Sequence, residues 1–518
     1  MAVAHMTEID SLLDVLADST VPCEDARRQM VSAAAAVDRL AVVVERGNRL
    51  GLPPFAERPF DPAAAGPVST GMSESASVER RKFTGFEDRV RQTLARIDDL
   101  NPDVRAIIER CDETACQQAR RLDEEASGEE GPVNALGGMT FTIKDVFGLA
   151  GHPTRANSRL LRNGGIAEKS AELVSALTQA GAIAVGKTVC WELSIAETDD
   201  SEALFPRARN PWNMSRDTGG SSSGSAAAVA AGLCDISLCT DTGGSTRGPA
   251  SWCGLVGFKA SKGHFSMEGC LPLSPDFDSI GLMARQVEPC ARAFDALTGP
   301  APERQKTAAR GPRRIGIWRD AYRKDAPATE DVIRAFEGAL AAQHSDAVEF
   351  CEIDLPSLEY FSAAYVILAR AQTYRAWRSA LQADPGSLGQ TARNRILSCG
   401  LFGPDLVDLA QALRTKLRHY VDAAFRAVDV ITMPTMPIAA PDCSDAALVM
   451  AFDKPSYVRF ASLFGLPSIS LPCGLTPEGM PVGAMLTAAY GQDCDLLEIA
   501  GTCETALPTL TPPLFEGK

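Results

Sequence analysis

The chain has 518 residues, of which 45% are hydrophobic and 23% charged, so it can bury a large core and is not a disordered chain. Its 51 basic and 66 acidic residues give a net charge of −15, which argues against nucleic acid or an anionic membrane as a partner, because both require clustered Lys and Arg. No apolar run approaches the roughly 20 residues that span a bilayer, and the first residues lack an export signal, so we expect a soluble cytoplasmic protein.

Metal and cofactor motifs are missing from the sequence. The five histidines are far apart, and the 15 cysteines are scattered with no Cys-x-x-Cys pair. Free cysteines in such numbers are typical of a reducing compartment. We find no flavin or nicotinamide fingerprint, and we expect neither a metal nor a cofactor.

The first part of the chain indicates a small helical module. After Pro22, apolar residues recur at the spacing of one helix face, at Met30, Ala34, Val37, Ala41 and Val44. Residues 51–80 are rich in Pro, Ala, Gly and Ser and are typical of an extended linker. We therefore expect a helical module over residues 1–60, a linker over 61–80 and the main domain over 81–518.

The next segments predict helices and then strands. Phe86, Val90, Leu94 and Ile97 lie on one helix face, and Asn101-Pro102 is expected to end that helix. Residues 103–126 are expected to be helical, and the polar stretch 127–131 to end that second helix. Residues 137–145, 182–185 and 236–240 indicate strands separated by helices, which favours an α/β sheet.

The most informative stretch is a glycine- and serine-rich run over residues 217–232, followed by a buried strand that ends in Thr242-Gly-Gly-Ser245. Two glycines before a serine allow backbone N–H groups to point into a pocket, where they can hold an oxyanion. A flexible linker would not have apolar, strand-like flanks. A phosphate loop would end in Gly-Lys-Ser/Thr, which this run does not. A serine nucleophile site is the third interpretation.

Within that interpretation, Gly220 to Gly224 formally matches the Gly-x-Ser-x-Gly elbow of α/β-hydrolases, with Ser222 as nucleophile. The elbow requires a strand directly before it, whereas residues 210–218 are typical of a loop. The later histidines also stand in contexts unsuited to a catalytic base.

These motifs together resemble the amidase signature family. The resemblance rests on the 24-residue interval from Ser221 to Ser245, the ending Gly-Gly-Ser-Thr-Arg-x-Pro, the strand-borne Lys144, and pieces at residues 186–188, 210–212, 252–254, 257–259, 433–437 and 465–474. It covers roughly residues 80–505. Ser223, Ser462 and Trp252 depart from the usual family residues, and these departures bear on pocket shape. The resemblance implies an α/β fold with a large twisted mixed sheet covered by helices, plus the N-terminal helical module.

The resemblance also implies residue roles. Ser245 would be the nucleophile, and Ser221, after a cis peptide bond from Gly220, would link it to Lys144. The N–H groups of the turn would form the oxyanion hole, and further residues would brace the site, with Ser222 hydrogen-bonded to Lys144. The oxyanion set is Thr242, Gly243, Gly244 and Ser245, the bracing set is Ser222, Asp241 and Arg247, and the candidate substrate contacts are Ile195, Trp252, Phe277 and Tyr457.

Elementary chemistry agrees with a lysine base. A serine hydroxyl needs a base, and an exposed lysine, with a pKa near ~10.4, is charged at neutral pH. Burial among hydroxyl groups would disfavour the charge. The neighbouring Asp145 should point away from Lys144, because successive side chains of a strand face opposite sides.

The family resemblance implies hydrolysis of a small, non-peptide amide through an acyl-enzyme on Ser245. Residues 10–65 resemble the small companion subunits of glutamyl-tRNA amidotransferase and of the carboxybiuret hydrolase complex, with residues 52–55 and 58–60 as docking contacts; the alternative is an unrelated helical extension. Two other functions stay open: a glutaminase subunit of a tRNA-dependent amidotransferase, and a catalytically silent scaffold. We expect a homodimer with a small-molecule amide substrate and no nucleic-acid or membrane partner.

Overall fold

A computed structural model describes residues 2–16, 23–49, 51, 56–59, 85–126, 135–197, 199–298, 312–343, 347–445 and 456–513. Within them one twelve-stranded sheet runs through the molecule, in the order β1-β9-β8-β10-β12-β11-β6-β7-β5-β3-β4-β2. The strands are β1 Ala56–Pro59, β2 Ile107–Arg110, β3 Thr140–Lys144, β4 Ile183–Thr188, β5 Ile236–Asp241, β6 Val256–Lys259, β7 Ser279–Ala284, β8 Arg313–Ile317, β9 Val348–Asp354, β10 Val430–Pro434, β11 Ser468–Leu475 and β12 Pro481–Ala488.

The sheet is mixed, as the resemblance implied. Strand β3 runs parallel to both β4 and β5, and β8 runs parallel to β9 and β10, whereas β5, β6 and β7 pair antiparallel. Every residue of β3 is buried, because β3 lies inside the sheet and both of its faces are covered. The predicted strands at 137–145, 182–185 and 236–240 are confirmed as β3, β4 and β5.

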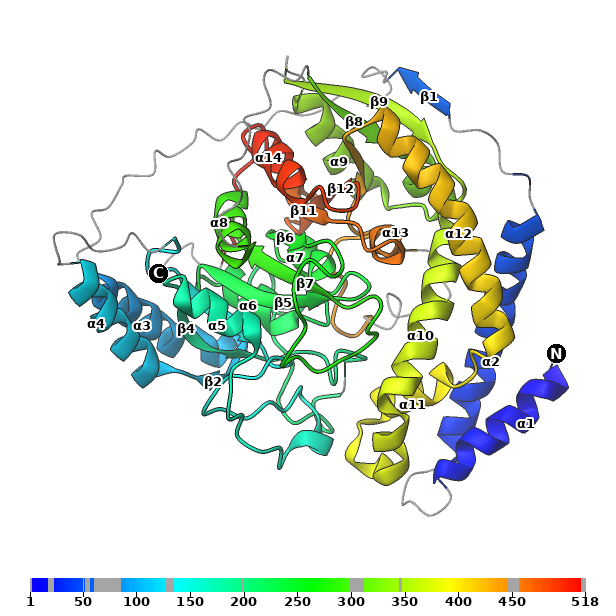
Figure 1. The fold of residues 1–518 in the computed structure, drawn as a ribbon, viewed down its shortest axis with the longest axis horizontal. Coiled ribbons are helices and arrows are strands. Elements are labelled where there is room, and N and C mark those ends of the chain that lie inside the picture. Colours follow the sequence, from blue (N-terminus) through cyan, green and yellow to red (C-terminus); the bar gives the residue numbers. More distant parts are fainter. Residues whose placement is uncertain are drawn as a thin grey trace.

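Helices cover this sheet (Figure 1). They are α1 Ala2–Leu13, α2 Cys23–Arg49, α3 Phe86–Val104, α4 Asp112–Ala126, α5 Glu172–Gln179, α6 Ser223–Ala230, α7 Arg247–Trp252, α8 Val287–Thr298, α9 Glu330–Ala342, α10 Leu358–Ala383, α11 Gln390–Cys399, α12 Pro404–Ala427, α13 Val458–Leu463 and α14 Asp493–Glu504. Helix α6 begins directly in the glycine- and serine-rich run. Its eight residues are all buried, because Ala, Ser and Gly side chains let it pack closely behind the sheet.

The predicted end of α3 and the predicted start of α4 need correction. Helix α3 continues through Pro102 to Val104, and Arg105 closes it with a left-handed φ of 55° and an N–H donated to the Asn101 carbonyl. The Asn101 side chain then accepts the N–H groups of Ala106 and Ile107. The chain turns into strand β2 here, so only residues 112–126 of the predicted second helix are helical. The stretch 127–131 lies outside the described residues.

The N-terminal helices pack on the rest of the molecule. Figure 1 shows α2, in blue, alongside α10 and α12, in yellow to orange. Four residues of the predicted apolar stripe, Met30, Ala34, Val37 and Val44, are buried, and all four belong to the main hydrophobic core. Asn48 donates to the Leu409 carbonyl at 3.0 Å, and Asn394 donates to Gln29 at 2.8 Å.

The last part of the predicted helical module contains a strand. Residues 56–59 form β1, which pairs antiparallel with β9, and Arg58 donates to Asp354 at 2.6 Å. The predicted docking residues 52–55 and the linker over 61–80 lie outside the described residues. Among the helices described, none alone is long and apolar enough to cross a membrane, and α11 with α12, bent by 82°, meets that length and composition only as a pair.

Candidate active site

Lys144 ends strand β3 and has no exposed surface. Its ammonium nitrogen, Nζ, donates to Ser221 Oγ at 2.6 Å and to Thr240 Oγ1 at 2.9 Å. Burial lowers the pKa of Lys144 from the ordinary lysine value, which favours the uncharged amine. This is the environment that a lysine needs to accept a proton at neutral pH.

The next residue, Asp145, points to the other face, as predicted. Its carboxylate lies 2.6 Å from the ammonium of Lys187, and both side chains are buried. Asp145 also accepts the N–H groups of Arg155 and Ala156. Lys187, in the motif piece at residues 186–188, therefore forms an ion pair with Asp145 on the side of the strand away from Lys144.

Ser221 lies in the loop before α6. The peptide bond between Gly220 and Ser221 is cis, as the resemblance implied. A Cβ atom on Gly220 would lie 1.9 Å from the ring of Trp191, so only glycine fits there. The Ser222 hydroxyl does not bind Lys144 as expected. It donates to the Thr240 carbonyl at 3.4 Å, and Thr240 is the second hydroxyl partner of the lysine.

Ser245 follows strand β5 and lines a cavity of about 490 Å³. Its carbonyl accepts the N–H of Ser222 at 3.3 Å, which joins the two serine-bearing loops. Within the described part of the chain, no hydrogen bond connects the hydroxyls of Ser221 and Ser245. Hydrogen bonds of catalytic groups are often long without substrate, so the second link of the predicted relay stays a prediction.

The turn after β5 does not leave all four of its predicted N–H donors available. The Gly244 N–H donates to Asp241 Oδ1 at 2.7 Å, so Gly244 is not supported as an oxyanion donor. Thr242, Gly243 and Ser245 stay candidates, and all three residues line the cavity. The Thr242 hydroxyl donates to Asp278 at 2.7 Å, which fixes the start of the turn.

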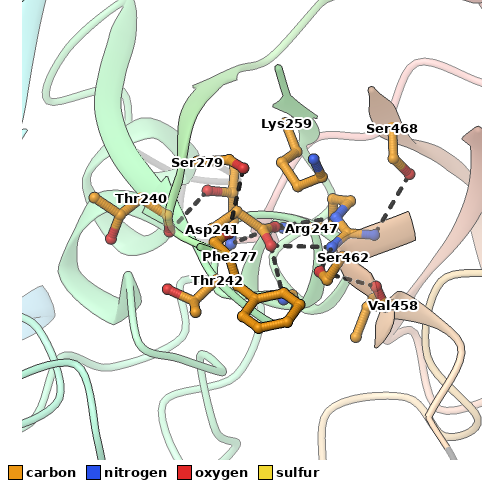
Figure 2. A network of polar contacts seen from close by, with 12 residues as sticks. Thr240, Asp241, Thr242, Arg247, Lys259, Phe277, Ser279, Val458, Ser462 and Ser468 are labelled. Carbon is orange, nitrogen blue, oxygen red and sulfur yellow. Dashed lines mark hydrogen bonds and ion pairs between the residues drawn. The ribbon is translucent and has the colours of Figure 1, made fainter. Parts of the chain in front are cut away.

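Asp241 and Arg247 form a buried bidentate ion pair beneath this turn (Figure 2). Arg247 Nε and Nη2 donate to the two carboxylate oxygens at 3.0 and 2.9 Å. Burial opposes the charge of Asp241, but Arg247 and Lys259 overcome that effect and lower the pKa of Asp241 to about 2. Arg247 also donates to Ser462 at 3.0 Å, at the position where the sequence departs from the family residue.

The cavity tests the predicted substrate contacts. Ile195 and Trp252 line it. Phe277 and Tyr457 do not: Phe277 is buried beside Tyr365, and the Tyr457 hydroxyl donates to the Ala326 carbonyl. Neither ring lines the cavity that Ser245 lines, so contact of Phe277 and Tyr457 with the substrate stays a prediction.

Sequence reasoning missed several residues at this site. Thr240 could have been found, because β3 and β5 are neighbouring parallel strands and Thr240 lies close to the predicted site. The cavity-lining residues Tyr365, Arg370, Arg395 and Arg459 come from helices far along the chain, and no local motif marks them. No cluster of three or more His, Cys, Asp or Glu that could hold a metal ion occurs among the described residues.

Comparisons with known proteins agree with this geometry. The family model described as Amidase matches residues 88–497. A glutamyl-tRNA(Gln) amidotransferase subunit of Thermus thermophilus is 34% identical over 462 residues, covering 82% of this chain and 94% of that protein. Among solved structures, a crystal structure of amidase gives a TM-score of 0.72 at 31% identity, covering 82% of this chain and 97% of the other. A chain of an inhibitor-bound "vestigial protein complex" linked to an s-triazine catabolic enzyme gives 0.73 at 28%, covering 83% and 97%.

The fold, which combines a mixed sheet with covering helices, and the site define an enzyme that hydrolyses carbon–nitrogen bonds. The family match extends over most of the chain. The loop that precedes α6 and the turn that carries Ser245 both line one cavity. The chain belongs to the amidase signature family.

Proposed function

We propose that the chain hydrolyses the C–N bond of a small, non-peptide amide through an acyl-enzyme on Ser245, with Ser221 and Lys144 as its proton relay. The observation that supports this most is the pairing of buried Lys144 with Ser221 at 2.6 Å beside a cavity that Ser245 lines. Burial favours the neutral amine, which is the form that can act as a base.

The cycle balances as an acyl transfer followed by hydrolysis. Lys144 takes a proton from Ser221 as Ser221 takes the proton of Ser245, whose oxygen attacks the amide carbon. N–H groups of the turn stabilise the oxyanion. The C–N bond then breaks, and the leaving amine receives a proton through Ser221. Water activated by the same relay cleaves the ester, releases the acid and restores Ser245.

Covalent labelling tests the nucleophile. An organofluorophosphonate should modify the wild-type chain, and Ser245→Ala should lose both this label and amide turnover. Ser379→Ala, an exposed serine on α10, is the control and should keep both. Unchanged labelling of Ser245→Ala would remove Ser245 from this role.

A second candidate is a glutaminase subunit, because the curated relative from Thermus thermophilus carries an amidotransferase name. The fused N-terminal helices speak against a need for a separate small subunit. Purified chain alone should hydrolyse amides if the first proposal holds. Activity only with glutamine and an added large subunit would favour the glutaminase, and no turnover or labelling under any condition would favour a silent scaffold.

A further inference from the structure

The segment over residues 191–197 carries four of the residues that line the cavity beside Ser245, and the proposed proton relay uses none of them. Its backbone is strained, because Leu193 and Ser194 have φ angles of 50° and 60°, which residues with a side chain rarely adopt. The Leu193 N–H donates at 2.9 Å to the carbonyl of Ala156, which itself has a φ of 45°. Such conformations persist only where the surrounding contacts enforce them, and they are concentrated at functional sites.

The first residue of this segment holds the loop that carries Ser221. The Trp191 N–H donates to the Ser221 carbonyl at 3.0 Å. The Trp191 ring packs on Gly220, so closely that a Cβ atom there would lie 1.9 Å from it. Just beyond Ser221, the Gly224 N–H donates to the Val189 carbonyl at 3.0 Å. The position of Ser221 therefore depends on where the Trp191 ring lies.

The next residue, Glu192, joins this segment to two others, and it is only 1% exposed. Its carboxylate accepts the Ser158 hydroxyl at 2.7 Å and the Gly389 N–H at 3.3 and 3.2 Å from its two oxygens. Gly389 directly precedes α11, so the carboxylate lies at the helix end whose N–H groups require acceptors. The Glu192 carbonyl accepts the Ile195 N–H at 2.8 Å, which closes the strained turn.

Two more hydrogen bonds join this part of the chain to α11. The Gln390 N–H donates to the carboxylate of Glu202 at 2.7 Å, and Arg395 donates to the Ile195 carbonyl at 3.0 Å. The cavity wall over residues 191–197 is thus held by contacts with α11. Glu192 is not among the described residues that line the cavity, so it acts on the site only through its neighbours.

We propose that Glu192 is a positioning residue, which acts through the ring of Trp191 to fix the Ser221 hydroxyl. With Glu192 in place, that hydroxyl stays where it can pass a proton from Ser245 to Lys144. This inference rests on the proposed function, because it takes Ser221 as the middle of the relay. A misplacement of about 1 Å between reacting groups can cost about 100-fold in rate, so a small movement of this loop is sufficient to matter.

Saturation kinetics of labelling by an organofluorophosphonate test this inference, because they separate binding of the label from attack by Ser245. Glu192→Ala should lower the maximal labelling rate about tenfold or more and change the half-saturating concentration by less than about twofold. Glu192→Gln keeps a side-chain carbonyl that can accept the same hydrogen bonds, so it should recover most of the rate. All variants are compared at a temperature at which circular dichroism shows them folded.

Asp493→Ala is the matched control. Asp493 is also 1% exposed, and it accepts the N–H and the hydroxyl of Ser261 at 2.7 and 2.5 Å. Its removal leaves the same kinds of groups unpaired, away from the cavity, and should keep the wild-type labelling rate. If Glu192→Ala does not fold, Ser158→Ala removes one of the Glu192 hydrogen bonds and should lower the rate about threefold or more.

A double-mutant cycle tests the route through the ring. In a Trp191→Ala background, Glu192→Ala should cost clearly less than in the wild type, because both changes act through the same contact. Additive losses, equal losses in Glu192→Ala and Asp493→Ala, or a loss confined to the half-saturating concentration would each overturn the proposal. Absence of any label on wild-type Ser245 would instead contradict the proposed reaction, so the two failures are distinguishable.

Discussion

At the scale of single residues, the buried amine of Lys144 controls the chemistry. Its partners at Nζ are the hydroxyls of Ser221 and Thr240, and the neighbouring carboxylate of Asp145 is occupied by Lys187. Hydroxyl groups accept a hydrogen bond from either form of the amine, whereas a carboxylate would stabilise the ammonium form. The strand alternation that turns Asp145 away is therefore part of what makes Lys144 able to act as a base.

Lys144→Met should abolish acylation of Ser245 and change the pH dependence of stability. Because burial lowers the pKa of Lys144 in the folded chain, the unfolded chain binds more protons over the range below the ordinary lysine pKa of ~10.4. As the pH rises, the free energy of unfolding of the wild type therefore increases relative to that of Lys144→Met.

Urea unfolding at pH 7 and pH 10 measures this effect. We expect the stability of Lys144→Met relative to wild type to be more favourable at pH 7 than at pH 10 by at least about 1 kcal/mol. If the stability of Lys144→Met relative to wild type were the same at both pH values, or less favourable at pH 7 than at pH 10, Lys144 would be charged in the folded chain.

At the scale of elements, helices α10 and α13 fix the turn between β5 and α7. Tyr365 and Val458 pack so closely on Gly243 and Gly244 that neither glycine can carry a side chain without movement. Gly244 also has a φ of 111°, which favours glycine. The turn is thus shaped by two helices that lie more than 100 residues further along the chain.

Gly243→Ala should therefore reduce kcat by about tenfold or more, because the new methyl group would displace the Tyr365 hydroxyl or the turn itself. Removing that hydroxyl should relieve the contact, so Gly243→Ala should cost less in a Tyr365→Phe background than in the wild type.

A double-mutant cycle on kcat measures this coupling. Gly165→Ala, where a Cβ atom meets nothing within 4 Å, is the control and should keep wild-type activity. Additive losses in the cycle would mean that Tyr365 does not position Gly243.

The difference between local sequence patterns and contacts made by distant helices explains which features could be predicted from the sequence. Strand β3 was predictable from its local alternation, whereas the Lys144–Ser221 contact and the bracing of the turn by Asp241 and Arg247 were implied by the family resemblance. Strand β2 was missed, since four residues between two helices carry too weak a pattern. The three cavity arginines required the packing of three helices. The homodimer and the cytoplasmic location stay predictions.

At the scale of the whole molecule, the N-terminal helices share the main core. Met30 of α2 is fully buried and belongs to the same cluster as residues of α10 and α12, and its neighbour Val31 is 47% exposed. Helix α10 carries Arg370, which lines the cavity beside Ser245. Because α2 packs against α10, it supports from the outside a helix that forms part of the cavity wall.

Met30→Asp should lower the free energy of unfolding by about 3 kcal/mol or more, because it buries an unpaired carboxylate. Val31→Asp makes the same chemical change one residue away and should cost less than about 0.5 kcal/mol. Thermal unfolding of the two variants compares them directly. Equal stability losses would mean that α2 does not pack on the main domain as described.

The ends of the sheet have a consequence for solubility. Its two outermost strands, β1 and β2, are only four residues long, and β1 carries Glu57, Arg58 and Pro59. Short edges with charged side chains and a proline offer little backbone for another chain to add to. A twelve-stranded sheet would otherwise be a ready template for fibre growth, and these two small strands protect the enzyme from it at high concentration.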